Sequence, residues 1–316
     1  MTAKRAGQVD PEGRADRAEQ TGYPEHLREE VERYLQGMRF SHEPLTEGLE
    51  EAMRYSLLAG GKRIRPVLTL ATARAVGIEQ RDVLPLAGAI ELIHTYSLIH
   101  DDLPAMDDDV LRRGMPTCHV KYGEDVAILA GDGLYAEAFR HLLTMQRSAP
   151  ERVLLAAAEL ADATGVDGMV GGQYADVNPA TPDGPAALRR VHELKTGRLI
   201  NASVVCVLLL GGIDGPATMC FRRFATELGV LFQIVDDILD VTGTDDALGK
   251  PRGSDERHGK RTYVSEFGME RAKQLAAESH RTAREALAEA ASAGSGARDA
   301  GAELEQIADF IYTRTS

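Results

Sequence analysis

The chain has little of what marks a secreted or membrane-spanning protein. Its 316 residues include three cysteines, Cys118, Cys206 and Cys220, and none of them belongs to a CxxC pair. An odd and sparse set of this kind is typical of reduced thiols in the cytoplasm, where we therefore expect the protein. The polar N-terminus lacks the apolar segment of a signal peptide, and the longest apolar run, near residues 203–210, is too short for a stable membrane span.

Positive charge is also scarce. The chain carries 49 Asp and Glu against 36 Lys and Arg, which gives a formal net charge of −13. This balance argues against nucleic acid as a partner, because nucleic-acid backbones attract basic surfaces. A protein this acidic that binds phosphate groups must use local basic clusters and metal ions, since its overall field repels anions.

The alternating apolar pattern of long strands is missing as well, and no internal repeat has a fixed period. Apolar residues recur instead at helical spacing over residues 45–59, 66–100, 124–145 and 264–292. Residues 1–22 show no periodic apolar face, so we expect a flexible N-terminal tail there and one domain over 23–316.

The chain does contain a dense acidic segment followed by arginines. Asp101, Asp102 and the three aspartates at 107–109 lie within nine residues, and Arg112 and Arg113 come soon after. Adjacent carboxylates repel one another unless cations intervene, whereas arginine forks suit phosphate oxygens. Magnesium ions between the carboxylates and a polyphosphate would satisfy both groups. A solvated acidic loop is the alternative interpretation.

A second acidic cluster lies far along the chain. Residues 232–240, FQIVDDILD, set Asp236, Asp237 and Asp240 among apolar residues. On a helix Asp236 and Asp240 are i,i+4 neighbours, as are Gln233 and Asp237. Carboxylates within an apolar segment need cations or hydrogen-bond donors. Two acidic helix faces from distant parts of the chain therefore predict a shared site for metal ions and a diphosphate.

A basic cluster follows a glycine pair in residues 60–66, GGKRIRP. Lys62, Arg63 and Arg65 stand close together just before Pro66, whose missing N–H suits the start of a helix. The same cluster is compatible with a helix C-terminus stabilised by cations. Beside the two acidic motifs, it predicts a second diphosphate pocket.

Two helix-breaking residues shape the predicted site. Pro104 should end the helix that carries Asp101, which lets Asp107 turn back toward the same ion. Gly197 lies inside an expected helix, where glycine costs about 1 kcal/mol relative to alanine. We expect a local kink there that turns Lys195 into a cavity, whereas a lone lysine would extend along the surface.

Six motifs in one order resemble the trans-isoprenyl diphosphate synthases, the polyprenyl synthetase family, over about residues 24–316. They are GGKRIRP at 60–66, SLIHDDLPAMDDDVLRRG at 97–114, GGQYADV at 171–177, LKTGR at 194–198, FQIVDDILD at 232–240, and GKPRGSD with GKRTY at 249–263. The resemblance implies an all-α, single-domain bundle of ten or more helices around a large central cavity. It also implies a homodimer that uses Mg²⁺ to join isopentenyl diphosphate head to tail to an allylic diphosphate.

The resemblance further implies roles for individual residues. The magnesium ligands would be Asp101, Asp102, Asp107, Asp236, Asp237 and Asp240. The allylic substrate would contact Arg112, Lys195, Thr196, Gln233, Lys250 and Lys260, with the last two lysines closing over the phosphate. Isopentenyl diphosphate would contact Lys62, Arg65, His94 and Arg113, and Gln173 would line the reaction centre. The expected catalytic residues are Asp101, Asp102, Asp107, Arg112, Lys195, Asp236 and Lys250.

Product length depends on the helix before the first acidic motif. Tyr96 lies five residues before Asp101, where its bulky ring would close the end of the cavity that holds the growing chain. An aromatic residue there, together with a two-residue insertion that gives LPAM between Asp102 and Asp107, resembles bacterial farnesyl diphosphate synthases. Ser97, one turn before Asp101, is small and leaves a geranylgeranyl product open. We predict farnesyl diphosphate, made from dimethylallyl and geranyl diphosphates, with geranylgeranyl diphosphate as the alternative.

Three other functions fit parts of the sequence. A class I terpene cyclase also ionises a diphosphate with magnesium, but it has no use for the basic cluster at 60–66. A phosphohydrolase built on His100 and Asp101 would need further histidines near the second acidic cluster, and none stands there. A non-catalytic synthase subunit would lack one or both acidic motifs, whereas this chain has both.

Overall fold

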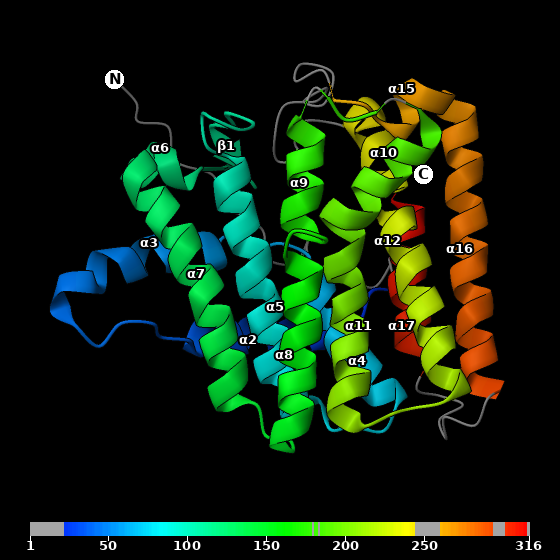
Figure 1. Ribbon diagram of the computed structural model, residues 1–316, viewed down its shortest axis with the longest axis horizontal. Helices are drawn as coiled ribbons and strands as arrows, with labels where there is room; N and C mark the ends of the chain where they lie inside the picture. Colours follow the sequence, from blue (N-terminus) through cyan, green and yellow to red (C-terminus); the bar gives the residue numbers. More distant parts are fainter. Residues whose placement is uncertain (1–21, 179, 183, 244–259, 293–300, 315–316) are drawn as a thin grey trace, which may run out of the picture.

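The computed structural model of the chain is almost entirely helical. It describes residues 22–178, 180–182, 184–243, 260–292 and 301–314. Within these segments the strands β1 (Leu111–Arg112) and β2 (Met115–Pro116) form a single short antiparallel hairpin, in which Leu111 pairs with Pro116. Long helices lie side by side, most of them along one direction (Figure 1). The predicted all-α bundle is confirmed, and the predicted tail lies outside the described residues except for Gly22.

The helices follow most of the expected apolar periods, and α7 matches the prediction for 124–145. In chain order they are α2 (Glu25–Gly37), the 3₁₀ helix η1 (Pro44–Thr46), α3 (Glu47–Leu57), α4 (Ile64–Ala75), α5 (Gln80–Asp101), α6 (Cys118–Tyr122), α7 (Glu124–Met145), α8 (Pro150–Thr164), α9 (Met169–Val177), α10 (Pro185–His192), the π-helix η2 (Glu193–Gly197), α11 (Arg198–Gly211), α12 (Pro216–Thr242), α15 (Tyr263–Phe267), α16 (Met269–Ser292) and α17 (Ala302–Thr313).

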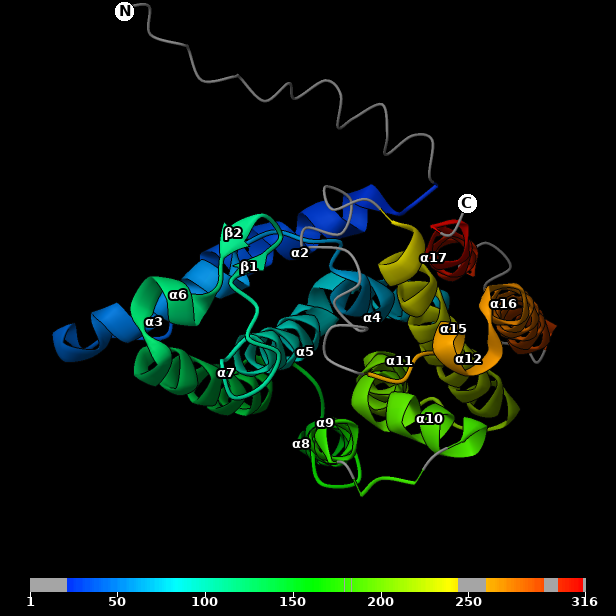
Figure 2. The same cartoon turned by 90° about the horizontal axis from the view of Figure 1, so that it is seen from above.

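The core of the molecule is built around α4, α5 and α11. α11 packs against α4, α5, α8 and α12, and ten of its fourteen residues are buried. The central position of α4 and α5 is visible from above (Figure 2). Among the described residues, two helical stretches are long and apolar enough to cross a membrane, Gln80–Asp101 (α5) and Pro185–Gly211 (α10, η2 and α11 together). Their apolar windows are 67% and 56% buried inside the protein, so packing in the core accounts for their apolar character.

The helical apolar spacing over residues 66–100 belongs to two helices, α4 and α5. Between them Gly77 has a φ of +76°, which ends a helix and is accessible to glycine without strain. α5 then ends at Asp101, shortly before Pro104, as the sequence predicted. The first acidic motif therefore begins at a helix C-terminus and continues into a turn.

Candidate active site

The elements that carry the predicted motifs surround a cavity of about 680 Å³. The predicted site residues that line it are Lys62, Arg65, His94, Tyr96, Ser97, Asp101, Asp107, Arg112, Arg113, Gln173, Lys195, Thr196, Gln233, Asp236, Asp237, Asp240 and Lys260. Asp102 is not among the lining residues, and Lys250 lies outside the described residues. Motifs that are far apart in the sequence thus meet at one site.

Asp101 ends α5, and the chain turns back directly after it. The backbone N–H of Asp107 donates to the carbonyl of Asp101 at 2.9 Å, which closes the turn around Pro104. Gln173 Nε2 donates to Oδ1 of Asp101 at 2.8 Å. Burial raises the pKa of Asp101, the charge of Lys195 opposes this shift, and the neighbouring carboxylate of Asp107 adds to it. The proline break therefore brings two carboxylates to one corner of the cavity.

Asp102 has a different environment from its neighbour. Nε of Arg112 lies 2.7 and 3.0 Å from its two carboxylate oxygens, and a second guanidinium nitrogen lies 2.6 Å from Oδ1. Burial raises the pKa of Asp102 to about 6, although Arg112 favours its charged form. Arg112 also reaches Asp109 at 3.5 Å. In the structure Asp102 holds Arg112, and the magnesium role that the resemblance implies for Asp102 stays a prediction.

The acids of the second motif also differ from one another. Asp236 leaves 54% of its side chain exposed, and Arg314 lies 3.8 Å from it. Asp237 is buried and accepts hydrogen bonds from Gln233 Nε2 and from the backbone N–H of Tyr263, both at 2.7 Å. Asp236 is therefore the acid of this pair that is open to a ligand, whereas Asp237 joins α12 to α15.

The kink predicted near Gly197 is a turn of π-helix. In η2, Lys195 Nζ donates to Asp176 at 2.7 Å, and Thr196 Oγ1 donates to Gln233 Oε1 at 3.0 Å. α9 approaches this turn closely, because a Cβ on Gly172 would lie only 2.2 Å from the backbone nitrogen of Lys195. Single π-helical turns are frequent at functional sites, since they redirect side chains. Here the turn presents Lys195 and Thr196 to the cavity.

The cavity offers carboxylates on two walls, and this donor set fits magnesium. Among the residues that the structure describes, no three His, Cys, Asp or Glu side chains lie close enough to enclose a metal ion. Asp101 and Asp107 lie on one wall and Asp236 on another, and Lys260 Nζ donates to Asp107 at 2.8 Å. Magnesium is usually held by one or two carboxylates, with waters and substrate phosphates completing its shell. The site suits an ion that shares its coordination with a diphosphate.

A separate basic cluster lies between the start of α4 and the middle of α5. Nη1 of Arg65 lies 3.4 Å from Nε2 of His94, and Arg113 donates to the carbonyl of Gly60. Burial and the nearby arginines lower the pKa of His94 well below its ordinary value, so the imidazole is neutral. Burial lowers the pKa of Arg65 to about 10, which leaves it charged at neutral pH. These groups form a preorganised pocket for an anion.

Tyr96 is fixed between α5 and α7. Its ring centroid lies 5.0 Å from that of Tyr135 and 5.4 Å from that of His100, in edge-on contacts. His100 occupies the space next to Gly131, where a Cβ would come within 2.1 Å of Nε2. Burial raises the pKa of Tyr96 to about 12. The ring is therefore a rigid, neutral part of the cavity wall.

Three further residues of the cavity were missed by the sequence analysis. Arg314 follows α17, far from every motif, so no local pattern marks it. Asp176 stands three residues after Gln173, and Glu91 stands three residues before His94. Helical spacing would have found both acids, because residues three apart lie on one helix face.

These features define a class of enzyme. The all-α fold lines one cavity with two acidic walls, with Lys195 in a π-helical turn, and with a second cluster of cations. Such a cavity has places for two diphosphates, which is typical of enzymes that join isoprenoid diphosphates.

Comparison with known proteins agrees with this class. The polyprenyl synthetase family matches residues 46–295, and the chain belongs to this family and is a trans-prenyltransferase. The chain is 48% identical to a chloroplastic geranylgeranyl pyrophosphate synthase of Capsicum annuum, over 84% of this chain and 71% of that protein. It is also 48% identical to the large subunit 1 of a heterodimeric geranylgeranyl pyrophosphate synthase of Arabidopsis thaliana, over 77% and 68% of the two chains.

Solved structures show the same fold. A geranyltransferase from Legionella pneumophila matches with a TM-score of 0.80 and 30% identity, over 95% of this chain and 98% of that one. A geranyltransferase from Helicobacter pylori, complexed with magnesium and isoprenyl diphosphate, matches with a TM-score of 0.78 and 32% identity, over 92% and 95% of the two chains. A farnesyl/geranylfarnesyl diphosphate synthase from Zymomonas mobilis matches with a TM-score of 0.76 and 32% identity, over 91% and 96%.

Proposed function

We propose that the chain condenses isopentenyl diphosphate head to tail with dimethylallyl and then geranyl diphosphate to give farnesyl diphosphate. The observation that carries the product assignment is the position of Tyr96. Its ring lines the cavity and is held from behind by Tyr135 and His100. A bulky ring that cannot swing aside limits the space for a growing chain, because packed protein interiors yield little to extra volume.

In this proposal the allylic diphosphate binds between the acidic walls. Asp101, Asp107 and Asp236 would hold magnesium against its oxygens, and Lys195 and Lys260 would contact the same phosphates. Bound magnesium neutralises the charge that develops on a departing diphosphate. Lys195 and Lys260 already lie at carboxylates, 2.7 and 2.8 Å away, so both cations are held within the site. Thr196, Gln233 and Arg112 would complete the contacts to the substrate.

Isopentenyl diphosphate would bind in the basic cluster of Lys62, Arg65, His94 and Arg113. The allylic carbon–oxygen bond breaks and its electron pair leaves with diphosphate. The double bond of isopentenyl diphosphate then attacks the allylic cation, and a proton is lost from the resulting cation to form the new double bond. Released diphosphate is the proposed base. Fixing the two substrates side by side supplies much of the acceleration, and excluding water protects the cation.

Product analysis tests this proposal. Purified protein with magnesium, isopentenyl diphosphate and each allylic primer should give a fifteen-carbon product as the main species. Tyr96→Ala should lengthen the product to twenty carbons or more, because it removes the ring from the cavity wall. Tyr135→Phe keeps a ring against Tyr96 and should leave the product unchanged. If Tyr96→Ala gives the wild-type product, the wall lies elsewhere.

Geranylgeranyl diphosphate is the second candidate product. Two observations favour it, the small side chain of Ser97 in the cavity lining and the names of the plant relatives at 48% identity. A dominant twenty-carbon product from the wild-type protein would select this alternative. No condensation with any primer would instead favour a non-catalytic subunit or a cyclase.

We further propose that the protein is a homodimer in the cytoplasm. α7 and α8 expose a cluster of large apolar side chains, which are Ile128, Leu129, Leu143, Leu154 and Leu155. Large apolar side chains exposed along two adjacent helices suit an interaction site, and a second copy of the chain is the proposed occupant. The three cysteines are free thiols, which suits a reducing compartment.

A further inference from the structure

The first and last helices that the structure describes, α2 and α17, meet beside the basic cluster, although both lie outside the part of the chain that matches the family, residues 46–295. α2 and α17 come together at one edge of the molecule (Figure 2). The ring of Tyr23, just before α2, lies 4.6 Å from that of Phe310 in α17. Lys62 Nζ lies over the same Phe310 ring, 4.9 Å from its centroid. Lys62 therefore lies where α2 and α17 converge.

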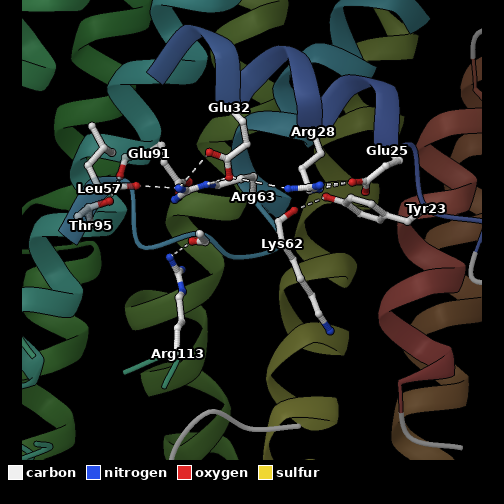
Figure 3. A network of polar contacts seen from close by, with 11 residues as sticks. Tyr23, Glu25, Arg28, Glu32, Leu57, Lys62, Arg63, Glu91, Thr95 and Arg113 are labelled. Atoms are coloured by element: carbon white, nitrogen blue, oxygen red, sulfur yellow. Dashed lines mark hydrogen bonds and ion pairs between the residues drawn. The ribbon is translucent and has the colours of Figure 1, made fainter. Parts of the chain in front are cut away.

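The backbone of Lys62 is held from the N-terminal side. The hydroxyl of Tyr23 donates a hydrogen bond of 2.7 Å to the carbonyl oxygen of Lys62, 39 residues away in the sequence. Burial, followed by the charge of Glu25, raises the pKa of Tyr23 above its ordinary value, so the hydroxyl keeps its proton and remains a donor. Figure 3 shows this contact, with the side chain of Lys62 extending away from α2.

The next residue, Arg63, is held from the same helix. Its φ of +51° lies in the left-handed region, which is uncommon for a residue with a side chain. Its fully buried guanidinium donates to Glu91 of α5 at 2.6 Å and to Glu32 of α2 at 2.8 Å, and it also donates to the carbonyl of Leu57 at 2.7 Å (Figure 3). Three elements thus fix a backbone conformation that Arg63 would not adopt readily by itself.

We propose that α2 belongs functionally to the isopentenyl diphosphate pocket, with Tyr23 and Glu32 as positioning residues that act through Lys62 and Arg63. This inference rests on the proposed function, which assigns the basic cluster to isopentenyl diphosphate. Lys62 and Arg65 flank the turn at Arg63, so the direction of both cations depends on that turn. Anchoring the turn lowers the cost of ordering two long cationic side chains around a diphosphate.

The helix does not need these polar contacts to pack. Leu27, Val31 and Leu35 bury its apolar face in the core. A merely structural role for Tyr23 and Glu32 would therefore change stability, and any kinetic effect would fall on both substrates alike. A positioning role changes the KM for isopentenyl diphosphate alone.

Kinetics of the full-length protein test the proposal. Tyr23→Phe keeps the ring on Phe310 and removes only the hydroxyl, and Glu32→Gln removes the charge at Arg63. Each should raise the KM for isopentenyl diphosphate about fivefold, the effect of one lost hydrogen bond, with the KM for the allylic diphosphate unchanged. Tyr34→Phe is the matched control, since the Tyr34 hydroxyl contacts His141 and not the turn. It should change neither KM.

Lys62→Ala separates failure of this inference from failure of the proposed function. If Lys62→Ala leaves the KM for isopentenyl diphosphate unchanged, the pocket assignment is wrong and the inference falls with it. If Lys62→Ala raises that KM but Tyr23→Phe and Glu32→Gln do not, only the inference is overturned. The double variant Tyr23→Phe/Lys62→Ala should raise that KM by less than the product of the two single effects, because part of the effect of Tyr23 passes through the Lys62 side chain. Additive effects, or equal effects on both substrates, would also overturn it.

Discussion

Lys62 projects into the cavity, yet the surrounding walls remove much of its hydration. This desolvation, followed by repulsion from Arg314, lowers the pKa of Lys62 to about 8, and Asp236 offsets part of the shift. An ammonium group with a lowered pKa is charged below that value and becomes neutral above it. The cation that we assign to isopentenyl diphosphate is therefore the most pH-sensitive member of its cluster.

This pKa predicts a specific loss of activity in alkaline solution. kcat/KM for isopentenyl diphosphate should fall as the pH rises through about 8, because free enzyme with neutral Lys62 binds the diphosphate less well. Lys62→Arg should move the fall to higher pH, since arginine keeps its charge. The check is a pH profile of kcat/KM for each substrate between pH 7 and 9.5. An identical alkaline fall in wild type and Lys62→Arg would show that another group titrates.

At the residue scale, the sequence identified the motifs that form the site. It did not distinguish the roles of adjacent residues within one motif. Asp101 and Asp107 could be predicted, because Pro104 explains how they converge. Adjacent aspartates look alike in a sequence, however, and only the fold shows that Asp102 turns to Arg112. Arg314 could not be predicted, because its place beside Asp236 depends on where α17 packs.

Among the elements, η2 is the one whose shape most directly sets the site. Its backbone lies in close contact with α9 on one side and with α12 on another. A Cβ on Gly172 would lie 2.2 Å from the nitrogen of Lys195, and one on Gly229 would lie 2.9 Å from Cα of Gly197. In each case the obstructing atom belongs to the backbone, so a rotamer change cannot relieve the clash.

Gly172→Ala should therefore damage both the fold and the activity. Separating α9 from η2 should cost about 1–3 kcal/mol of unfolding free energy, the usual range for overpacking. It should also lower kcat, because Lys195 and Thr196 move with the turn. Chemical denaturation and steady-state kinetics measure the two effects. Gly48→Ala is the control, since nothing lies within 4 Å of its Cβ position and alanine is favoured in a helix such as α3. Wild-type kcat in Gly172→Ala would contradict this account of η2.

Apolar periodicity predicted most helices, because each helix buries one face and that face repeats along the sequence. It did not predict the break at Gly77, since apolar residues continue at helical spacing on both sides of it. Gly197 did signal a distortion, because a glycine inside a helix is costly unless a close approach requires it. The sequence could not show that the distortion is one π turn facing α9 and α12.

For the whole molecule, the order of six motifs was enough to predict an all-α fold with a central cavity. The same motifs say nothing about the surface, since they face inward. The apolar cluster on α7 and α8 emerges only in the structure, which shows which apolar side chains stay exposed on these two adjacent helices. Leu154 and Leu155 remain 63% and 55% exposed there, a costly arrangement for a chain that stays alone.

If this cluster joins two copies, a charge in its middle should separate them. Leu155→Asp would place a carboxylate in the proposed interface, where desolvation without a partner opposes association. Sedimentation at micromolar concentration should show a dimer for wild type and a shift to monomer for the variant. Leu45→Asp is the matched control, because Leu45 is 91% exposed in η1, outside the α7–α8 cluster, and its substitution should leave the dimer intact. A wild-type monomer, or a Leu155→Asp dimer of unchanged stability, would mean that this face does not join two copies.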